Sequence, residues 1–109
     1  MKIEITDVQM TKIDEKILLL TLLGVLGALK SNSISIDEAE KFLFSPHTVK
    51  RLKASNCNQS VIEIVERGCE LEDIDSLIPD RLNENIENLY KNLLEVLETY
   101  QEFDKELWI

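Results

Sequence analysis

The chain has 109 residues, the usual length of one domain, and 44% of them are hydrophobic, which is enough to build a buried core. Glycine (3) and proline (2) are scarce, which argues against a turn-rich β-sandwich or barrel and favours helices. The formal net charge of −9 opposes approach to nucleic acid and to anionic membranes. We therefore expect an all-α fold, a single compact domain of five or six helices with long first and last helices.

The negative charge is concentrated toward the end of the chain. Residues 1–36 hold four basic and four acidic side chains, and residues 37–69 hold five of each. Residues 70–109 hold three basic side chains against twelve acidic ones. A field of this kind attracts basic partners. Binding to a basic protein is therefore expected, and binding to nucleic acid is not.

The first expected element is an N-terminal arm over residues 1–10, in which hydrophobic residues alternate weakly. A long helix is predicted to follow over residues 11–30. Thr11 can cap its first turn with its hydroxyl group, and Asp14 and Glu15 face the positive end of the helix dipole.

Residues 17–29 of this helix carry no charge and are apolar on nearly every face, which predicts a central buried helix. The run is shorter than the roughly twenty residues needed to cross a bilayer, and its acidic flank is unlike a signal peptide. We therefore expect a cytoplasmic protein without a membrane segment. Gly24, Gly27 and Ala28 form a small-residue face where another helix could come close.

Capping residues divide the middle of the chain into short predicted helices. The expected ranges are 35–44, 45–54, 59–67 and 71–77. A capping box of Ser35 and Glu38 opens the first of them. The Ser45-Pro46 pair provides an N-cap and first position for the second. Gly68 is predicted to end the third as a C′ residue.

The last predicted helix, over residues 80–107, has the clearest pattern. Apolar residues alternate at spacings of four and three in an unbroken heptad seam. The seam consists of Leu82, Ile86, Leu89, Leu93, Val96, Tyr100, Phe103 and Leu107. Further apolar residues at 90, 94 and 97 widen the stripe, which favours packing against the first helix over a two-stranded coiled coil. A monomer and a homodimer built through this seam both remain open.

Five glutamates are predicted to lie on the outward face of this last helix. They are Glu84, Glu87, Glu95, Glu98 and Glu102. Only Lys91 and Lys105 offset their negative charge. Like charges four residues apart on a helix repel each other. A solvated face kept for solubility is the competing interpretation, but such a face more often mixes both signs. We therefore expect the five glutamates to bind a basic partner.

Residues suited to catalysis or metal binding are few. His47, Cys57 and Cys69 are one ligand short of a closed zinc site and lack its paired spacing. The acidic run 70–75 lacks the glycine of a calcium-binding loop and the regular spacing of its ligands, so a solvated turn is expected there. The two cysteines are expected to be free thiols. We expect no enzyme activity, no metal and no cofactor.

Residues 38–52 resemble the helix-turn-helix of LuxR-type regulators, which has a Ser-Pro-x-Thr-Val-Lys recognition helix. The resemblance implies that Ala39, Phe42, Phe44, Val49 and Leu52 are interior positions. It also implies that His47, Lys50, Arg51 and Lys53 face DNA. Glu38 occupies a normally apolar position, and the spacer to the first helix is longer than in that family. DNA binding through residues 45–54 is the alternative function, and a structural homodimer is a third.

The chain as a whole looks like a family of small helical bacterial proteins of unknown function. The resemblance lies in Phe44-Ser45-Pro46, Glu70-Leu71-Glu72-Asp73 and Ser76-Leu77-Ile78-Pro79. It implies that some members act as immunity proteins beside toxins, without assigning any residue a role. The expected function is thus an immunity or antitoxin protein that neutralises a basic toxin such as a nuclease.

Overall fold

The structure is a computed structural model that describes residues 9–107, and its regular elements are all helical. They are α1 (Lys12–Lys30), α2 (Ile36–Phe42), α3 (Pro46–Ala54), α4 (Gln59–Cys69), α5 (Leu71–Leu77), the 3-10 turn η1 (Pro79–Arg81) and α6 (Leu82–Leu97). The all-α prediction is confirmed. The four longer helices, α1, α3, α4 and α6, form the framework. The expected count of five or six is reached only when α2 and α5, which have seven residues each, are included.

The predicted N-terminal arm lies outside the described residues, apart from Gln9 and Met10. Helix starts follow the predicted capping signals. At α1, the Asp14 N–H donates to the Thr11 hydroxyl and the Thr11 N–H donates to the Asp14 carboxylate, each at 3.1 Å. Side chains of Ser35 and Ser45 accept from backbone N–H groups in the first turns of α2 and α3. Local sequence therefore determines where these helices begin.

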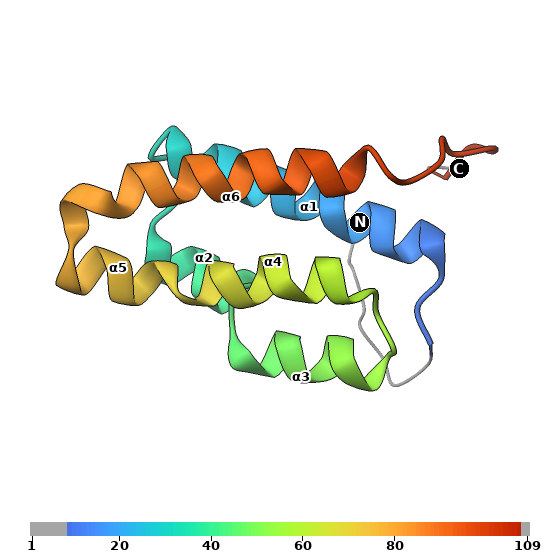
Figure 1. Ribbon diagram of the computed structural model, residues 1–109, viewed down its shortest axis with the longest axis horizontal. Helices are drawn as coiled ribbons and strands as arrows, with labels where there is room; N and C mark the ends of the chain where they lie inside the picture. Colours follow the sequence, from blue (N-terminus) through green and yellow to red (C-terminus); the bar gives the residue numbers. More distant parts are fainter. Residues whose placement is uncertain (1–8, 108–109) are drawn as a thin grey trace.

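The core is built around α1 and α6, which run antiparallel and side by side, with α4 packed against α6 (Figure 1). From α6, the seam residues Ile86, Leu89 and Leu93 are buried in the same cluster as Leu22 and Leu26 of α1. The predicted packing of the last helix against the first is confirmed. The seam is thus used inside the chain, where it buries its apolar surface without a second copy.

The last helix is shorter than predicted. It ends at Leu97 instead of continuing to residue 107. The Tyr100 N–H donates to the Leu97 carbonyl at 3.0 Å in a tight turn, and residues 101–107 contain no helix. Residues 98–107, here called the C-terminal segment, instead lie beside the first turns of α1. Phe103 and Leu107 therefore do not extend the helical seam.

Two predictions about glycines are wrong. A Cβ atom added at Gly24 or Gly27 would meet no atom of the described residues within 4 Å, so no helix in residues 9–107 packs against these two glycines. Gly68 does not end α4, which continues to Cys69. A Cβ atom at Gly68 would collide with the ring of Phe44. This glycine is required by the close approach of an aromatic ring, and it has no positive φ angle.

The apolar run in α1 is a core segment. Leu18, Leu19, Leu22 and Leu26 are fully buried. Within residues 9–107, no helix has the combination of length and apolar character needed to cross a membrane.

Candidate functional site

The five glutamates predicted to bind a partner do not share one helical face. Glu84, Glu87 and Glu95 lie on α6, Glu98 is its C-cap, and Glu102 lies in the C-terminal segment. The predicted helical repulsion between Glu98 and Glu102 is therefore wrong, because the helix ends before Glu102. The shorter helix removes the regular spacing on which that prediction depended.

Two of these glutamates have basic neighbours. The Arg81 guanidinium lies 3.3 Å from a Glu84 carboxylate oxygen, and the Lys30 ammonium lies 2.9 Å from Glu87. The hydrogen bond from Lys30 holds the pKa of Glu87 below its usual value. Lys30 also lies over the ring of Tyr90, 4.3 Å from its centroid. Much of the negative charge at the start of α6 is therefore balanced locally.

The other three glutamates are exposed and unbalanced. Glu95, Glu98 and Glu102 point into solvent, and none of them makes an ion pair with another described residue. They lie at the end of the molecule where α6 stops and the C-terminal segment begins (Figure 1). These three remain available to a basic partner.

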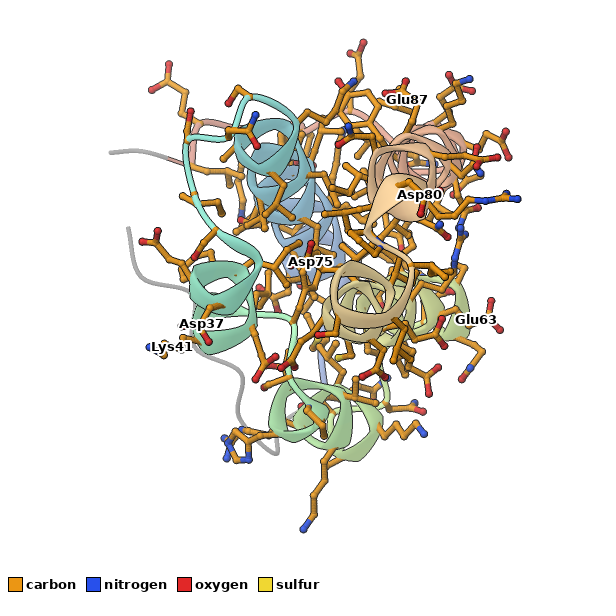
Figure 2. The ribbon with its side chains drawn as sticks, turned by 90° about the vertical axis from the view of Figure 1, so that its left-hand side faces the viewer. Asp37, Lys41, Glu63, Asp75, Asp80 and Glu87 are labelled. Carbon is orange, nitrogen blue, oxygen red and sulfur yellow. The ribbon has the colours of Figure 1, made fainter. Side chains whose placement is uncertain are left out.

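A denser acidic surface lies at the opposite end of the molecule, where α2 packs beside α5. It consists of Asp37, Glu38, Glu40, Glu70, Glu72, Asp73, Asp75 and Asp80, here called the acidic end. All of them except the partly buried Glu40 are exposed. Figure 2 looks onto this end and shows Asp37, Asp75 and Asp80 across it. Lys41 pairs with Asp37 at 3.1 Å, and no basic residue occurs between positions 70 and 80.

Like charges meet directly on this surface. A side-chain hydrogen bond to Glu40 raises the pKa of Glu72, and the negative charges of Glu40, Asp73 and Asp37 raise it further. Glu72 therefore holds a proton more readily than an isolated glutamate would. The fold holds negative charge together here at the cost of mutual repulsion.

Sequence reasoning missed the acidic end. The sequence predicts a solvated turn at 70–75, and residues 37–69 carry equal numbers of acidic and basic side chains. Only the packing of α2 on α5 brings the two groups together. The signal available in the sequence was the absence of any basic residue from 70 to 80.

The alternative DNA-binding residues lie on α3. His47, Lys50 and Lys53 are exposed, and Arg51 is half-buried. The Lys53 ammonium lies 3.7 Å from Glu66 of α4, so its charge is partly balanced. The described residues therefore place three basic side chains and an opposing carboxylate on this part of the surface.

The predicted interior positions of the helix-turn-helix are only partly correct. Ala39, Phe44 and Leu52 are buried, and Val49 is partly buried. The predicted interior position of Phe42 is wrong, because this residue is 61% exposed. It is the last residue of α2, and the chain turns inward only at Leu43 and Phe44.

A buried carboxylate that the sequence did not single out joins three parts of the chain. Glu15 is 3% exposed. It accepts hydrogen bonds from the backbone N–H of Asn58 at 2.7 Å and from the hydroxyl of Tyr100 at 2.8 Å. Lys12 adds an ion pair at 3.3 Å. The sequence predicted only a helix-dipole role for Glu15, because its distant partners depend on the tertiary fold.

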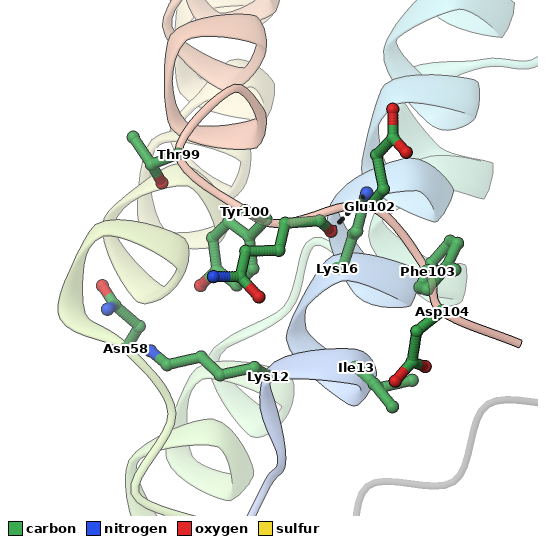
Figure 3. Close-up of a pocket in the computed structure, with 10 residues that line it drawn as sticks. Lys12, Ile13, Lys16, Asn58, Thr99, Tyr100, Glu102, Phe103 and Asp104 are labelled. Carbon is green, nitrogen blue, oxygen red and sulfur yellow. Dashed lines mark hydrogen bonds between the residues drawn. The ribbon is translucent and has the colours of Figure 1, made fainter.

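A cleft of about 450 Å³ lies beside this carboxylate, between the start of α1 and the C-terminal segment (Figure 3). Lys16 crosses it and donates to the Gln101 carbonyl at 2.8 Å. Its ammonium also lies 4.5 Å from the ring centroid of Phe103. These contacts hold the C-terminal segment in place. The cleft is therefore explained by a structural role for the residues around it.

The two cysteines are free thiols, as predicted. Burial, together with the nearby Glu15 carboxylate, raises the pKa of Cys57 to about 12. Burial also raises the pKa of Cys69. A thiol with a raised pKa is a poor nucleophile. Among residues 9–107, no group of three or more His, Cys, Asp and Glu side chains is placed to hold a metal ion.

Comparison with known proteins identifies the family to which this chain belongs. The model of the family described as "Protein of unknown function (DUF3969)" matches residues 9–109, and the chain belongs to this family. The predicted resemblance to a small family of unknown function is thereby confirmed. No curated protein and no solved structure matches the chain.

Proposed function

We propose that the protein is a non-catalytic binding protein of the immunity or antitoxin type, which neutralises a basic partner such as a toxin nuclease. The observation that carries the proposal is the negative charge on its surface, much of which has no basic residue beside it. Eight carboxylates gather at the acidic end, and Glu95, Glu98 and Glu102 add exposed charge at the other end. Holding like charges together costs free energy, which a basic partner would recover.

A nuclease provides a physical reason for this kind of partner. An enzyme that binds nucleic acid needs a basic surface for the phosphates. An acidic protein that covers this surface competes directly with the substrate, so it needs no catalytic group of its own. Opposite charges also speed the encounter, because long-range attraction raises the association rate. Fast capture suits a protein that must bind a toxin before the toxin acts.

Affinity purification from the native host tests the proposal. One bait is the natural protein, and the matched bait carries Glu95→Lys, Glu98→Lys and Glu102→Lys together with Asp73→Lys, Asp75→Lys and Asp80→Lys. We expect a basic protein to co-purify with the natural bait at low salt and to be depleted on the matched bait. The proposal would be overturned if both baits retain the same proteins, or if the retained protein is acidic. A co-purified basic protein should then lose its activity when one equivalent of this protein is added.

A further inference from the structure

The corner between α5 and η1 exposes an apolar pair. Leu77 is 79% exposed, more than any other large hydrophobic side chain in residues 9–107, and the adjacent Ile78 is 49% exposed. Earlier in the same helix, Leu71 is buried and Ile74 packs against the core. Leu77 lies beyond the point where the helix contacts the core, and Pro79 then directs the chain into η1.

Carboxylates flank this apolar pair along the chain. Asp75 precedes it by two residues and Asp80 follows it by two, and both lie across the same end of the molecule (Figure 2). Asp73 and Glu72 lie on the preceding turn of α5. Residues 70–80 carry five acids and no basic residue. The corner is therefore an apolar contact point inside an acidic rim, the arrangement of a hydrophobic interface core with a polar border.

The charge of the rim decides what can cover the corner. A second copy of the chain would bring two acidic ends together, and like charges at a contact oppose association. An anionic membrane would be repelled for the same reason. A basic protein surface that presents an apolar side chain among lysines and arginines matches both features. The lysines or arginines would face the rim, while the apolar side chain would cover Leu77.

We infer that Leu77 and Ile78 are the docking point for the basic partner, which places an apolar side chain on them while its basic residues pair with the acidic rim. This inference rests on the proposed function and adds the location and the mixed apolar and basic character of the partner's contact. Apolar contact at the centre controls dissociation, whereas the rim and the distant Glu95, Glu98 and Glu102 control the rate of encounter.

A defined peptide probe tests the inference. The probe is a short amphipathic peptide of lysine and leucine, and its control replaces every leucine with serine. Each peptide is titrated into the isotope-labelled natural protein, and amide chemical shifts locate the contact. We expect the lysine–leucine peptide to shift residues 72–80 and 36–40 most. We also expect Leu77→Ser with Ile78→Ser to weaken its binding at least about tenfold, since a few buried apolar contacts dominate binding.

Matched variants separate the outcomes. Leu20→Ser removes an exposed hydrophobic residue on α1, away from the acidic end, and should leave peptide binding unchanged. Circular dichroism should show that all variants keep their helices. Shifts centred on residues 95–98 or on the open face of α1 near Leu20 and Gly24 would overturn the inference while leaving basic-partner binding intact. Self-association lost in the Leu77→Ser variant would overturn it in favour of a second copy. Failure of both cationic peptides to bind at low salt would count against the proposed function itself.

Discussion

At the scale of single residues, Glu15 explains why the C-terminal segment turns back. An ionised carboxylate taken out of water is strongly destabilising unless donors surround it. Glu15 obtains them from Asn58 and Tyr100, which lie 43 and 85 residues away in the chain. Continuing α6 as a straight helix would carry Tyr100 away from this carboxylate. The buried acid thus overrides the heptad pattern at the end of the chain.

Removing the Tyr100 hydroxyl should measure this effect. We expect Tyr100→Phe to lower the free energy of unfolding by about 1–2 kcal/mol, because a hydrogen bond to a charged group is lost. Urea denaturation at neutral pH measures the change. Tyr90→Phe is the matched control, since the ring of Tyr90 contacts Lys30 through its face, and it should change stability little. Equal losses in the two variants would contradict the role assigned to Glu15.

The two thiols should differ in reactivity. Cys57 is buried beside Glu15 with its pKa raised to about 12, whereas Cys69 is only partly buried. Since the thiolate is the reacting species, we expect Cys57 in the folded protein to be alkylated at least about tenfold more slowly than Cys69 near neutral pH. Mass spectrometry of digested samples gives the two rates. In denaturant without reductant, both should react, and a chain that takes up no adduct would show a disulfide instead.

Two glycines form a matched pair for testing the packing. Gly68→Ala places a methyl group against the ring of Phe44, so we expect a loss of about 1–3 kcal/mol in stability from overpacking. Gly24→Ala meets open space inside a helix, so we expect a gain of up to about 1 kcal/mol from helix propensity. Thermal unfolding measures both. A destabilised Gly24→Ala variant would show that something covers this face of α1.

At the scale of elements, local signals predict where helices begin, and tertiary contacts decide where they end. Thr11, Ser35 and Ser45 cap helices as predicted, because a cap needs only residues within one turn. The end of α6 and the continuation of α4 through Gly68 depend on Tyr100 and Phe44, whose partners are distant in sequence. Periodicity alone cannot reveal such contacts.

The candidate site shows the same division. The sequence predicts an acidic protein with its charge in the last forty residues, and the exposed Glu95, Glu98 and Glu102 agree with that prediction. The acidic end requires α2 and α5 to pack together, which spacing along the chain does not reveal. The ion pair between Lys30 and Glu87 cannot be predicted from spacing along the chain either, because these residues belong to different helices.

Helix α3 provides a test of the alternative function. Its basic residues are few, and Lys53 already lies near Glu66, while the net charge of −9 opposes approach to phosphates. We expect no measurable binding to duplex DNA at physiological salt in a gel-shift assay. Any weak binding at low salt should vanish on Lys50→Ala with Arg51→Ala, because counterion release depends on such residues. A tight, sequence-dependent shift would favour DNA binding over protein binding.

At the scale of the whole molecule, charge and apolar surface have separate roles in the binding that we propose. The acidic end and Glu95, Glu98 and Glu102 lie at opposite ends of a body 42 Å long. This distance is several times the screening length at physiological salt, which is about 8 Å. The two ends therefore act as separate charges on an approaching partner. At low salt, where the screening length reaches about 30 Å, we expect both ends to steer the proposed basic partner, while close contact at one of them sets the lifetime of the complex.

The most direct test of the account is the association rate of the co-purified basic partner, measured by stopped-flow mixing at increasing salt. The natural protein is compared with a variant carrying Glu95→Lys, Glu98→Lys and Glu102→Lys, and with one carrying Asp73→Lys, Asp75→Lys and Asp80→Lys. Circular dichroism checks that both variants keep their helices. We expect each reversal to slow association at low salt by at least about tenfold, and rising salt to slow association of the natural protein markedly. Association rates that change neither with salt nor in either variant would contradict capture by the acidic surface.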